Sequence, residues 1–156
     1  SSIKFCADHL ATEGVMTQTQ PAGKSAADID FGWHIAIASA DLDIGQALAV
    51  KERVTIAVEA VEGTDRMIAR AGELCKSGGW TMIKVARPNQ DPRFDVPTVG
   101  PKTIRNLHAA GCSTLVVQAG MTLIADKPAT LQLADSLKIA VVGKKPAPAD
   151  HIKLAE

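Results

Sequence analysis

The sequence predicts an α/β fold, a mixed β-sheet flanked by helices in a single compact domain. Short apolar runs of the strand type alternate along the chain with segments whose apolar residues recur at helical spacing. Strands that alternate with helices are typical of α/β domains, and two neighbouring strand-like runs add a hairpin, which makes the sheet mixed. The length of 156 residues matches one domain.

The first helix is predicted from about residue 25 to 39. Ser25 has the residue type of an N-cap, and Asp28 would place an acid in the first turn, where the helix dipole favours it. His34 lies beside the apolar face, where a histidine is more often structural than catalytic. The apolar residues that share this face are Ile29, Trp33, Ile37 and Ala40.

A hairpin is predicted next, because two strand-like runs, 46–50 and 53–60, flank the polar pair Lys51 and Glu52. From residue 65 the apolar spacing becomes helical, with Thr64 as the expected N-cap. The remaining elements are expected in this order: a strand at 80–86, a helix between Pro101 and Gly111, strands at 114–118 and 122–125, a helix at 127–136 and a strand at 138–142.

Composition excludes several classes of function. Lys plus Arg equals Asp plus Glu at 17 each, and no run of like charges is present, so no nucleic-acid partner is expected. No apolar run approaches the roughly 18 residues of a membrane span. The three cysteines are widely spaced without a CxxC motif, which argues against a disulfide framework or structural zinc and favours a cytoplasmic protein.

One apparent phosphate-binding motif fails on inspection. Gly23, Lys24 and Ser25 spell the end of a P-loop, yet Gln18 stands where that motif needs its first glycine. The segment also lacks a preceding apolar strand.

Two acidic segments each follow a predicted strand. The run 53–60 leads into Glu62 and Asp65, and the run 80–86 leads into a loop of about 14 residues, 87–100, where ordinary connections have about 2 to 6. Ligands of open α/β sheets bind outside the carboxyl ends of strands, so parallel strands would open both loops on one edge. A site is therefore predicted there.

The chemistry of these segments suits phosphoryl transfer. Asp91 and Asp95, with Asn89 and Gln90, offer the oxygen ligands that Mg²⁺ or Mn²⁺ prefers. Cationic side chains that could bind phosphate oxygens accompany them: Lys84, Arg87 and Arg93. The alternative is that these residues are only solvated turn residues.

The same stretches resemble a known family. "DIGQALAV", "AVEAVEGTDRMI", "KVARPNQDPRFDVPTVGP" and "AGMTLIAD" resemble, in order, segments of the UDP-2,3-diacylglucosamine pyrophosphatases of the LpxI type over about residues 12–143. The resemblance implies a C-terminal catalytic-type domain at 21–150, preceded by a connecting segment, 1–20, from an N-terminal domain and followed by a tail, 151–156. The family's site lies between its two domains.

The resemblance implies an activity as well. The family hydrolyses the pyrophosphate of UDP-2,3-diacylglucosamine to UMP and 2,3-diacylglucosamine 1-phosphate (lipid X) in the lipid A biosynthesis of Gram-negative bacteria. We therefore expect a metal-dependent hydrolase, cytoplasmic and peripheral to the inner membrane, with the N-terminal domain as partner and a homodimer left open. The isolated chain is expected to be poorly active.

Site residues follow from the same resemblance. Asp95 is expected to be the principal catalytic residue, with Asp91 second. Mg²⁺ or Mn²⁺ would be held by Asp95, Asp91, Glu62 and Asp65. The phosphate and substrate would be bound by Lys84, Arg87, Asn89, Gln90, Arg93 and Thr64. Gln118 and Met121 replace the glutamate and lysine that the family more often has near "AGMTL".

Two other functions remain compatible with the sequence. The domain could be a non-catalytic module that binds the lipid product or dimerises within a larger enzyme. It could also belong to another enzyme of phosphosugars or nucleotides that shares the scaffold.

Overall fold

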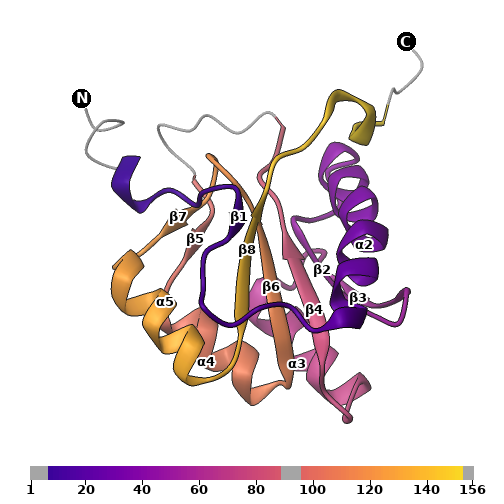
Figure 1. Ribbon diagram of the computed structural model, residues 1–156. Coiled ribbons are helices and arrows are strands. Elements are labelled where there is room, and N and C mark those ends of the chain that lie inside the picture. The colour runs from indigo at the N-terminus through magenta and orange to yellow at the C-terminus, as the bar shows by residue number, and fades with distance from the viewer. Residues whose placement is uncertain (1–6, 89–95, 153–156) are drawn as a thin grey trace.

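The computed structural model, which describes residues 7–88 and 96–152, is a single α/β domain with a six-stranded mixed sheet (Figure 1). The predicted fold class is confirmed. The sheet order is β1-β8-β6-β4-β2-β3, and a separate parallel ribbon pairs β5 with β7. The strands are β1 (Gly14–Val15), β2 (Ala47–Lys51), β3 (Val54–Val58), β4 (Trp80–Lys84), β5 (Thr98–Val99), β6 (Cys112–Gln118), β7 (Leu123–Ile124) and β8 (Ala140–Lys144).

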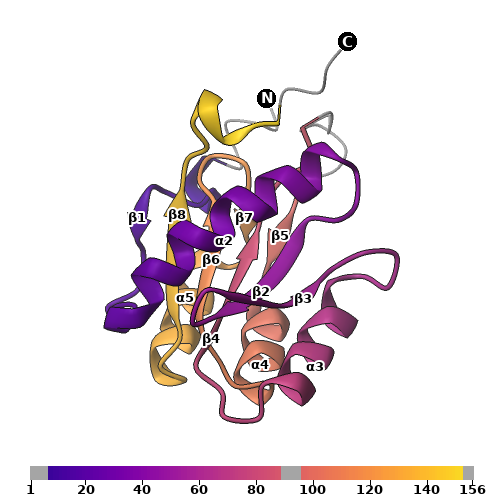
Figure 2. The same cartoon turned by 90° about the vertical axis from the view of Figure 1, so that its right-hand side faces the viewer.

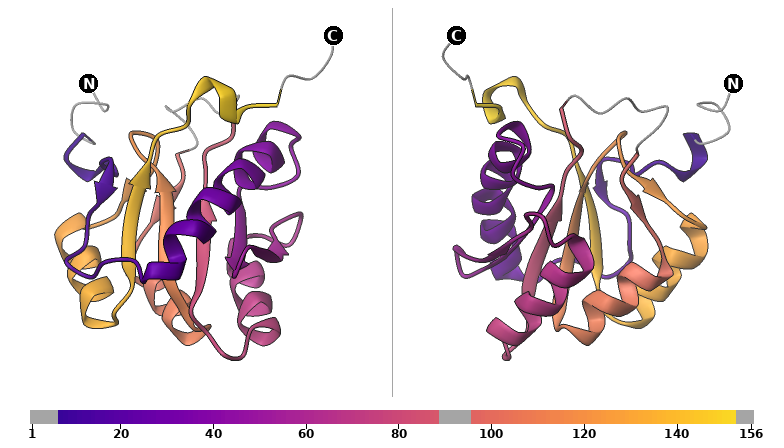
Figure 3. Two further views of the ribbon diagram at one scale, coloured as in Figure 1. Left: turned by 45° about the vertical axis from the view of Figure 1, so that its right-hand side comes forward. Right: turned by 180° about the vertical axis from the view of Figure 1, so that it is seen from behind.

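Helices cover both faces of the sheet (Figures 2 and 3). The α-helices are α2 (Gly23–Asp41), α3 (Thr64–Leu74), α4 (Pro101–Ala109) and α5 (Lys127–Ser136), with short 3-10 turns η1 (Ala7–His9) and η2 (Pro148–Asp150). No helix in the described ranges is long and apolar enough to cross a bilayer.

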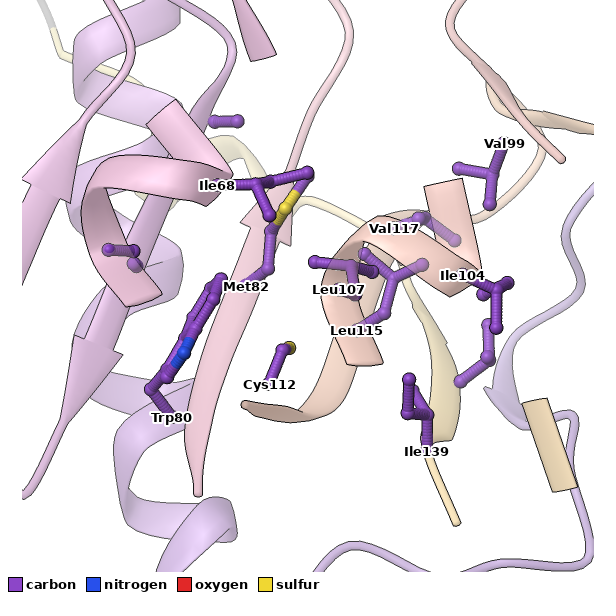
Figure 4. Close-up of a cluster of buried hydrophobic side chains, with 14 of the residues drawn as sticks. Ile68, Trp80, Met82, Val99, Ile104, Leu107, Cys112, Leu115, Val117 and Ile139 are labelled. Atoms are coloured by element: carbon purple, nitrogen blue, oxygen red, sulfur yellow. The ribbon is translucent and has the colours of Figure 1, made fainter. Parts of the chain in front are cut away.

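Two apolar clusters lie on opposite faces of the sheet. Helices α3, α4 and α5 pack on one face, where Met82 of β4 and Leu115 of β6 are buried (Figure 4). Helix α2 covers the other face, where the next residues along the same strands, Ile83 and Val116, are buried. Successive side chains of a strand point to opposite faces, and this alternation supplies both clusters from the same strands.

Helix α2 begins earlier than predicted, and its predicted cap is wrong. The helix starts at Gly23 after Ala22, no side chain caps its N-terminus, and Ser25 is buried inside the first turn. Asp28 is also buried rather than exposed to the helix dipole. The reason is tertiary, since this end of α2 packs against the β2–β3 hairpin.

The predicted hairpin is confirmed, and Asp28 holds its turn. Glu52 and Arg53 join the antiparallel strands and both have positive φ, 52° and 57°. Two-residue hairpin turns of this type favour Asn and Gly at these positions, so two long side chains there are strained. The Asp28 carboxylate accepts hydrogen bonds from the N–H of Glu52 at 3.1 Å and of Arg53 at 2.8 Å, which satisfies both turn amides.

Part of the predicted connecting segment packs closely on the domain. Val15 of β1 pairs with Val142 at the edge of the sheet. The Asp135 carboxylate accepts hydrogen bonds from the N–H and the hydroxyl of Thr19, both at 2.8 Å. Strand β8 begins at Ala140, two residues later than predicted, because Lys138 adopts a positive φ of 57° after α5.

Replacing Asp28 tests its role in the hairpin turn. We expect Asp28→Ala to lower the free energy of unfolding by about 1–3 kcal/mol, because it leaves two amides without their acceptor. Asp28→Asn should lose less, since one oxygen still accepts. The measurement is urea denaturation, with exposed Asp30→Ala on the same helix as control. Equal stability of Asp28→Ala and the control would contradict the assignment.

Candidate functional site

The carboxyl ends of β3 and β4 reach the same edge of the sheet. β2 runs antiparallel to both strands, so β3 and β4 point in the same direction, and Val58 and Ile83 both lie opposite Leu48. The parallel strands β6 and β8 end at this edge as well. The segments that follow β3 and β4 therefore begin at one edge of the sheet, where the sequence predicts the site.

Lys84 is the cationic group of this edge. It is the last residue of β4, half-buried, and lies opposite Ala47. Burial lowers the pKa of Lys84, and the negative charges of Glu59 and Asp65 oppose that shift. A partly desolvated ammonium attracts an incoming anion more strongly than a fully solvated one does, and the two carboxylates reduce that attraction.

Glu59, which is absent from the predicted site residues, organises the turn before α3. Its carboxylate accepts a hydrogen bond from the Thr64 hydroxyl at 3.0 Å. Thr64 is the first residue of α3 and not its cap, because Gly63, with a φ of 89°, occupies the N-cap position. The predicted strand extends to residue 60, whereas β3 ends at Val58, so Glu59 is the first residue after the strand and not part of it.

Glu62 is engaged by Arg70 of α3 and by an amide of its own loop. One carboxylate oxygen lies 2.6 Å from an Arg70 guanidinium nitrogen, and the other accepts the N–H of Ala60 at 3.0 Å. Hydrogen bonds from its own amide, from Arg70 and from Ala60 hold the pKa of Glu62 below its ordinary value. Arg70 also donates to the Val58 carbonyl at 2.9 Å, so this pair fixes the loop.

The described residues do not by themselves fit the predicted metal. Within residues 7–88 and 96–152, no three His, Cys, Asp or Glu side chains are grouped to hold an ion. Glu62 is paired with Arg70, and Asp65 is exposed in the first turn of α3. The other predicted site residues, Asn89, Gln90, Asp91, Arg93 and Asp95, lie outside the described residues. A metal site would have to draw on Asp91 and Asp95.

A cavity of about 420 Å³ opens beside this edge, on the face covered by α2. Gln118 is one of its lining residues, and its side-chain oxygen accepts the N–H of Ala86 at 3.0 Å, which ties the segment after β4 to the end of β6. Exposed Arg87, whose guanidinium lies 3.5 Å from the Asp43 carboxylate, borders the cavity. The lining residues are Ile37, Ala40, Asp41, Ala86, Arg87, Pro88, Gln118, Met121 and His151.

A larger cavity, about 550 Å³, lies between α3 and α4. Its floor includes Ala69, Gly72 and Ala109, and Asp65 is the only predicted site residue among those that line it. The smaller cavity is the better candidate, because it adjoins the end of β4, where Arg87 and Pro88 lead toward residues 89–95.

Residues 12–142 match the LpxI C-terminal domain. The chain belongs to that family. It is also 36% identical over 140 residues to the UDP-2,3-diacylglucosamine pyrophosphatase LpxI of Caulobacter vibrioides, an alignment that covers 85% of this chain and 50% of the relative. The predicted family is confirmed, and the chain spans about half the length of this relative.

The position of Lys84 predicts a dependence of stability on pH. A folded-state pKa below the unfolded one means that the unfolded chain binds more protons, so stability rises with pH between the lowered value and about 10.4. We expect Lys84→Met to flatten this rise, measured by urea denaturation from pH 7 to 10. Lys102→Met, at an exposed position, is the control. Identical slopes for wild type and Lys84→Met would be the contrary result.

Proposed function

We propose that the chain forms one wall of the active site of a pyrophosphatase that hydrolyses UDP-2,3-diacylglucosamine. The observation that carries this proposal is the 36% identity to the Caulobacter enzyme over 85% of the chain. The edge of the sheet supports it, because half-buried Lys84 and the Thr64 hydroxyl lie there, where the segment with the family's loop begins.

The reaction needs positioning and neutralisation of charge more than covalent chemistry. Water attacks phosphorus, the bond to the bridging oxygen breaks, and UMP and 2,3-diacylglucosamine 1-phosphate leave. Lys84 is suited to bind a pyrophosphate oxygen, because its ammonium is fixed at a strand end and partly desolvated. Glu59 and Thr64 keep the adjoining turn in place.

The segment 89–95 would supply the remaining groups. Asp95, with Asp91 as second choice, would orient the attacking water, and Arg87 and Arg93 would bind phosphate through their guanidinium groups. A divalent metal would neutralise the phosphate oxygens when bound there. The described residues alone do not group the ligands to hold such a metal.

A substrate with two acyl chains requires access to lipid. We propose a cytoplasmic enzyme that contacts the inner membrane peripherally, with its N-terminal domain closing the other wall. Apolar side chains of the smaller cavity, Ile37, Ala40 and Met121, lie beside Arg87. Such a mixture of apolar and cationic groups suits an amphiphilic phosphate.

Replacing Asp95 tests the catalytic assignment. In the two-domain protein, Asp95→Ala should lower the rate of UMP release roughly 100- to 10,000-fold with little change in melting temperature, because a loop carboxylate acts on the reaction more than on the fold. Exposed Glu73→Ala is the control. Parallel losses of activity and stability would instead make Asp95 a structural residue. Full activity of Asp95→Ala would remove it from the mechanism.

Removal of metal tests the proposed cofactor. We expect chelation by EDTA to abolish UMP release and added Mg²⁺ or Mn²⁺ to restore it, because the proposed ligands are carboxylate oxygens. The control is unfolding of the protein in EDTA, which should be unchanged if the metal serves only the reaction. Undiminished turnover in the chelator would exclude the metal.

A further inference from the structure

The segment after β8 brings a histidine–carboxylate pair to the smaller cavity. Residues 145–152, which we call the C-terminal strap, run from β8 to the C-terminal end of α2 (Figure 1). His151 of the strap and Asp41, the last residue of α2, both line the cavity. Of the four histidines, all of which lie in the described ranges, His151 is the only one that lines either cavity described above.

The Asp41 carboxylate holds the His151 ring through Nδ1. Its two oxygens lie 3.1 and 3.0 Å from Nδ1, and the N–H of Ile152 donates to the same carboxylate at 3.1 Å. The Asp41 side chain is 10% exposed, whereas the His151 side chain is 44% exposed. The carboxylate is therefore mostly withdrawn from water, while much of the imidazole stays accessible.

This contact fixes which ring nitrogen of His151 carries the proton. An ionised carboxylate only accepts hydrogen bonds, so Nδ1 must donate to Asp41. The neutral ring then has its proton on Nδ1 and a lone pair on Nε2. Nε2 makes no hydrogen bond with any residue of the described ranges. It is the basic atom that His151 offers to a ligand in the cavity.

The position of Asp41 is unfavourable unless its carboxylate has a partner. The C-terminus of a helix carries a partial negative charge, which disfavours an acid in the last turn. Both partners of Asp41, the His151 ring and the Ile152 N–H, come from the strap. The orientation of the imidazole is therefore produced by the docking of the strap on α2.

We propose that His151 is the general base of the hydrolysis and that Asp41 is its positioning residue. This inference rests on the proposed function, in which Asp95 orients the attacking water and no group is yet assigned to accept its proton. A histidine held by a carboxylate through Nδ1 accepts a proton at Nε2 in unrelated families of hydrolases.

The step balances with the groups already named. As the oxygen of water forms its bond to phosphorus, one proton of that water passes to the lone pair of Nε2. The bond from phosphorus to the bridging oxygen breaks, and its electron pair stays with the departing phosphate. The ionised carboxylate of Asp41 stabilises the imidazolium that forms, which returns its proton to solvent after the products leave.

The charged groups around His151 leave it as the group that titrates near neutral pH. Asp41 of α2 and Arg87, which follows β4, line the same cavity. Arg87 lies 3.5 Å from Asp43, and Asp150 precedes His151 in the strap. Among these side chains only histidine ordinarily changes charge between pH 5 and 8. A base must be neutral to accept a proton, so the rate should rise with pH over this range.

The strap also contains a second pair that serves as a matched control. Nδ1 of His34 lies 3.1 Å from the Asp150 carboxylate, whose side chain is 11% exposed. This pair ties the same strap to the same helix, yet His34 does not line the cavity. A purely structural role would make the two histidines equivalent, whereas a catalytic role requires only His151.

Steady-state kinetics of UMP release by the two-domain protein tests the proposal. His151→Gln can still donate to Asp41 but has no basic nitrogen. It should lower kcat about 100-fold or more at pH 7, with little change in KM or melting temperature, and should abolish the rise of the rate between pH 5 and 8. His34→Gln should retain both kcat and the pH profile. An unchanged kcat in His151→Gln, or an equal loss in His34→Gln, would overturn the proposal.

A double variant tests the role of Asp41. Asp41→Asn should also lower kcat, because an amide can donate to Nδ1 and stabilise the tautomer that carries its proton on Nε2. In a His151→Gln background the same change should cost no further activity, since the base is already absent. A full additional loss in the double variant would show that Asp41 acts independently of His151 and would overturn the assignment.

Failure of the inference is distinguishable from failure of the proposed function. A wild-type protein that releases no UMP from UDP-2,3-diacylglucosamine would reject both. An active wild type with an equally active His151→Gln would reject only the general base. Nitrogen-15 NMR of the imidazole rings gives a further readout without turnover, in which neutral His151 should have its proton on Nδ1. A proton on Nε2 in the neutral ring would overturn the proposed base and leave the proposed function untouched.

Discussion

The pairing of β2 between β3 and β4 is the constraint on which the candidate site depends. Leu48 lies opposite both Val58 and Ile83, so the two outer strands end level with each other and point in the same direction. Because the side chains of a strand alternate between faces, a slip of one residue would turn buried Leu48 and Ile83 toward the wrong face of the sheet. Burial of apolar side chains on both faces thus fixes the register, and the register places Glu59 and Lys84 on either side of Ala47.

This register also explains why a charged residue is tolerated at the end of a buried strand. Lys84 follows four fully buried residues of β4, and burial lowers its pKa. The carboxylates of Glu59 and Asp65 come from the turn after β3 and partly offset that effect. Neither acid is near Lys84 in sequence, so the arrangement exists only when the hairpin and β4 pair correctly. The strand pairing that stabilises the sheet therefore also sets the electrostatic environment of Lys84.

Sequence periodicity predicted the elements well, because apolar spacing records which face is buried. Ile29, Trp33 and Ile37 are buried on α2 as expected, and α5 has its predicted bounds. The caps were wrong, because a capping residue type does not reveal a competing tertiary partner. Thr64 donates its hydroxyl to Glu59. The pairing of Glu62 with Arg70 is likewise a property of a folded loop. The resemblance to the family implied a metal ligand at Glu62, and that assignment stays a prediction.

Helix α2 links the candidate cavity to the rest of the molecule. Its C-terminal turns supply Ile37, Ala40 and Asp41 to the cavity wall, and the segment after β8 secures that end. Asp150 accepts the indole N–H of Trp33 at 3.1 Å and lies 3.1 Å from His34, while His151 lies 3.0 Å from Asp41. The hydrogen bond from the N–H of Ala147 is the main cause that holds the pKa of Asp150 below its ordinary value. The contacts of Asp150 with Trp33 and His34 act in the same direction.

These contacts have a consequence for ligand binding. The inner face of α2 packs on the sheet, and its C-terminal half is tied to the segment after β8 through Asp41 and Asp150. These contacts hold the cavity wall of Ile37, Ala40 and Asp41 in place before a ligand arrives, so binding at the sheet edge can proceed without a rearrangement of α2.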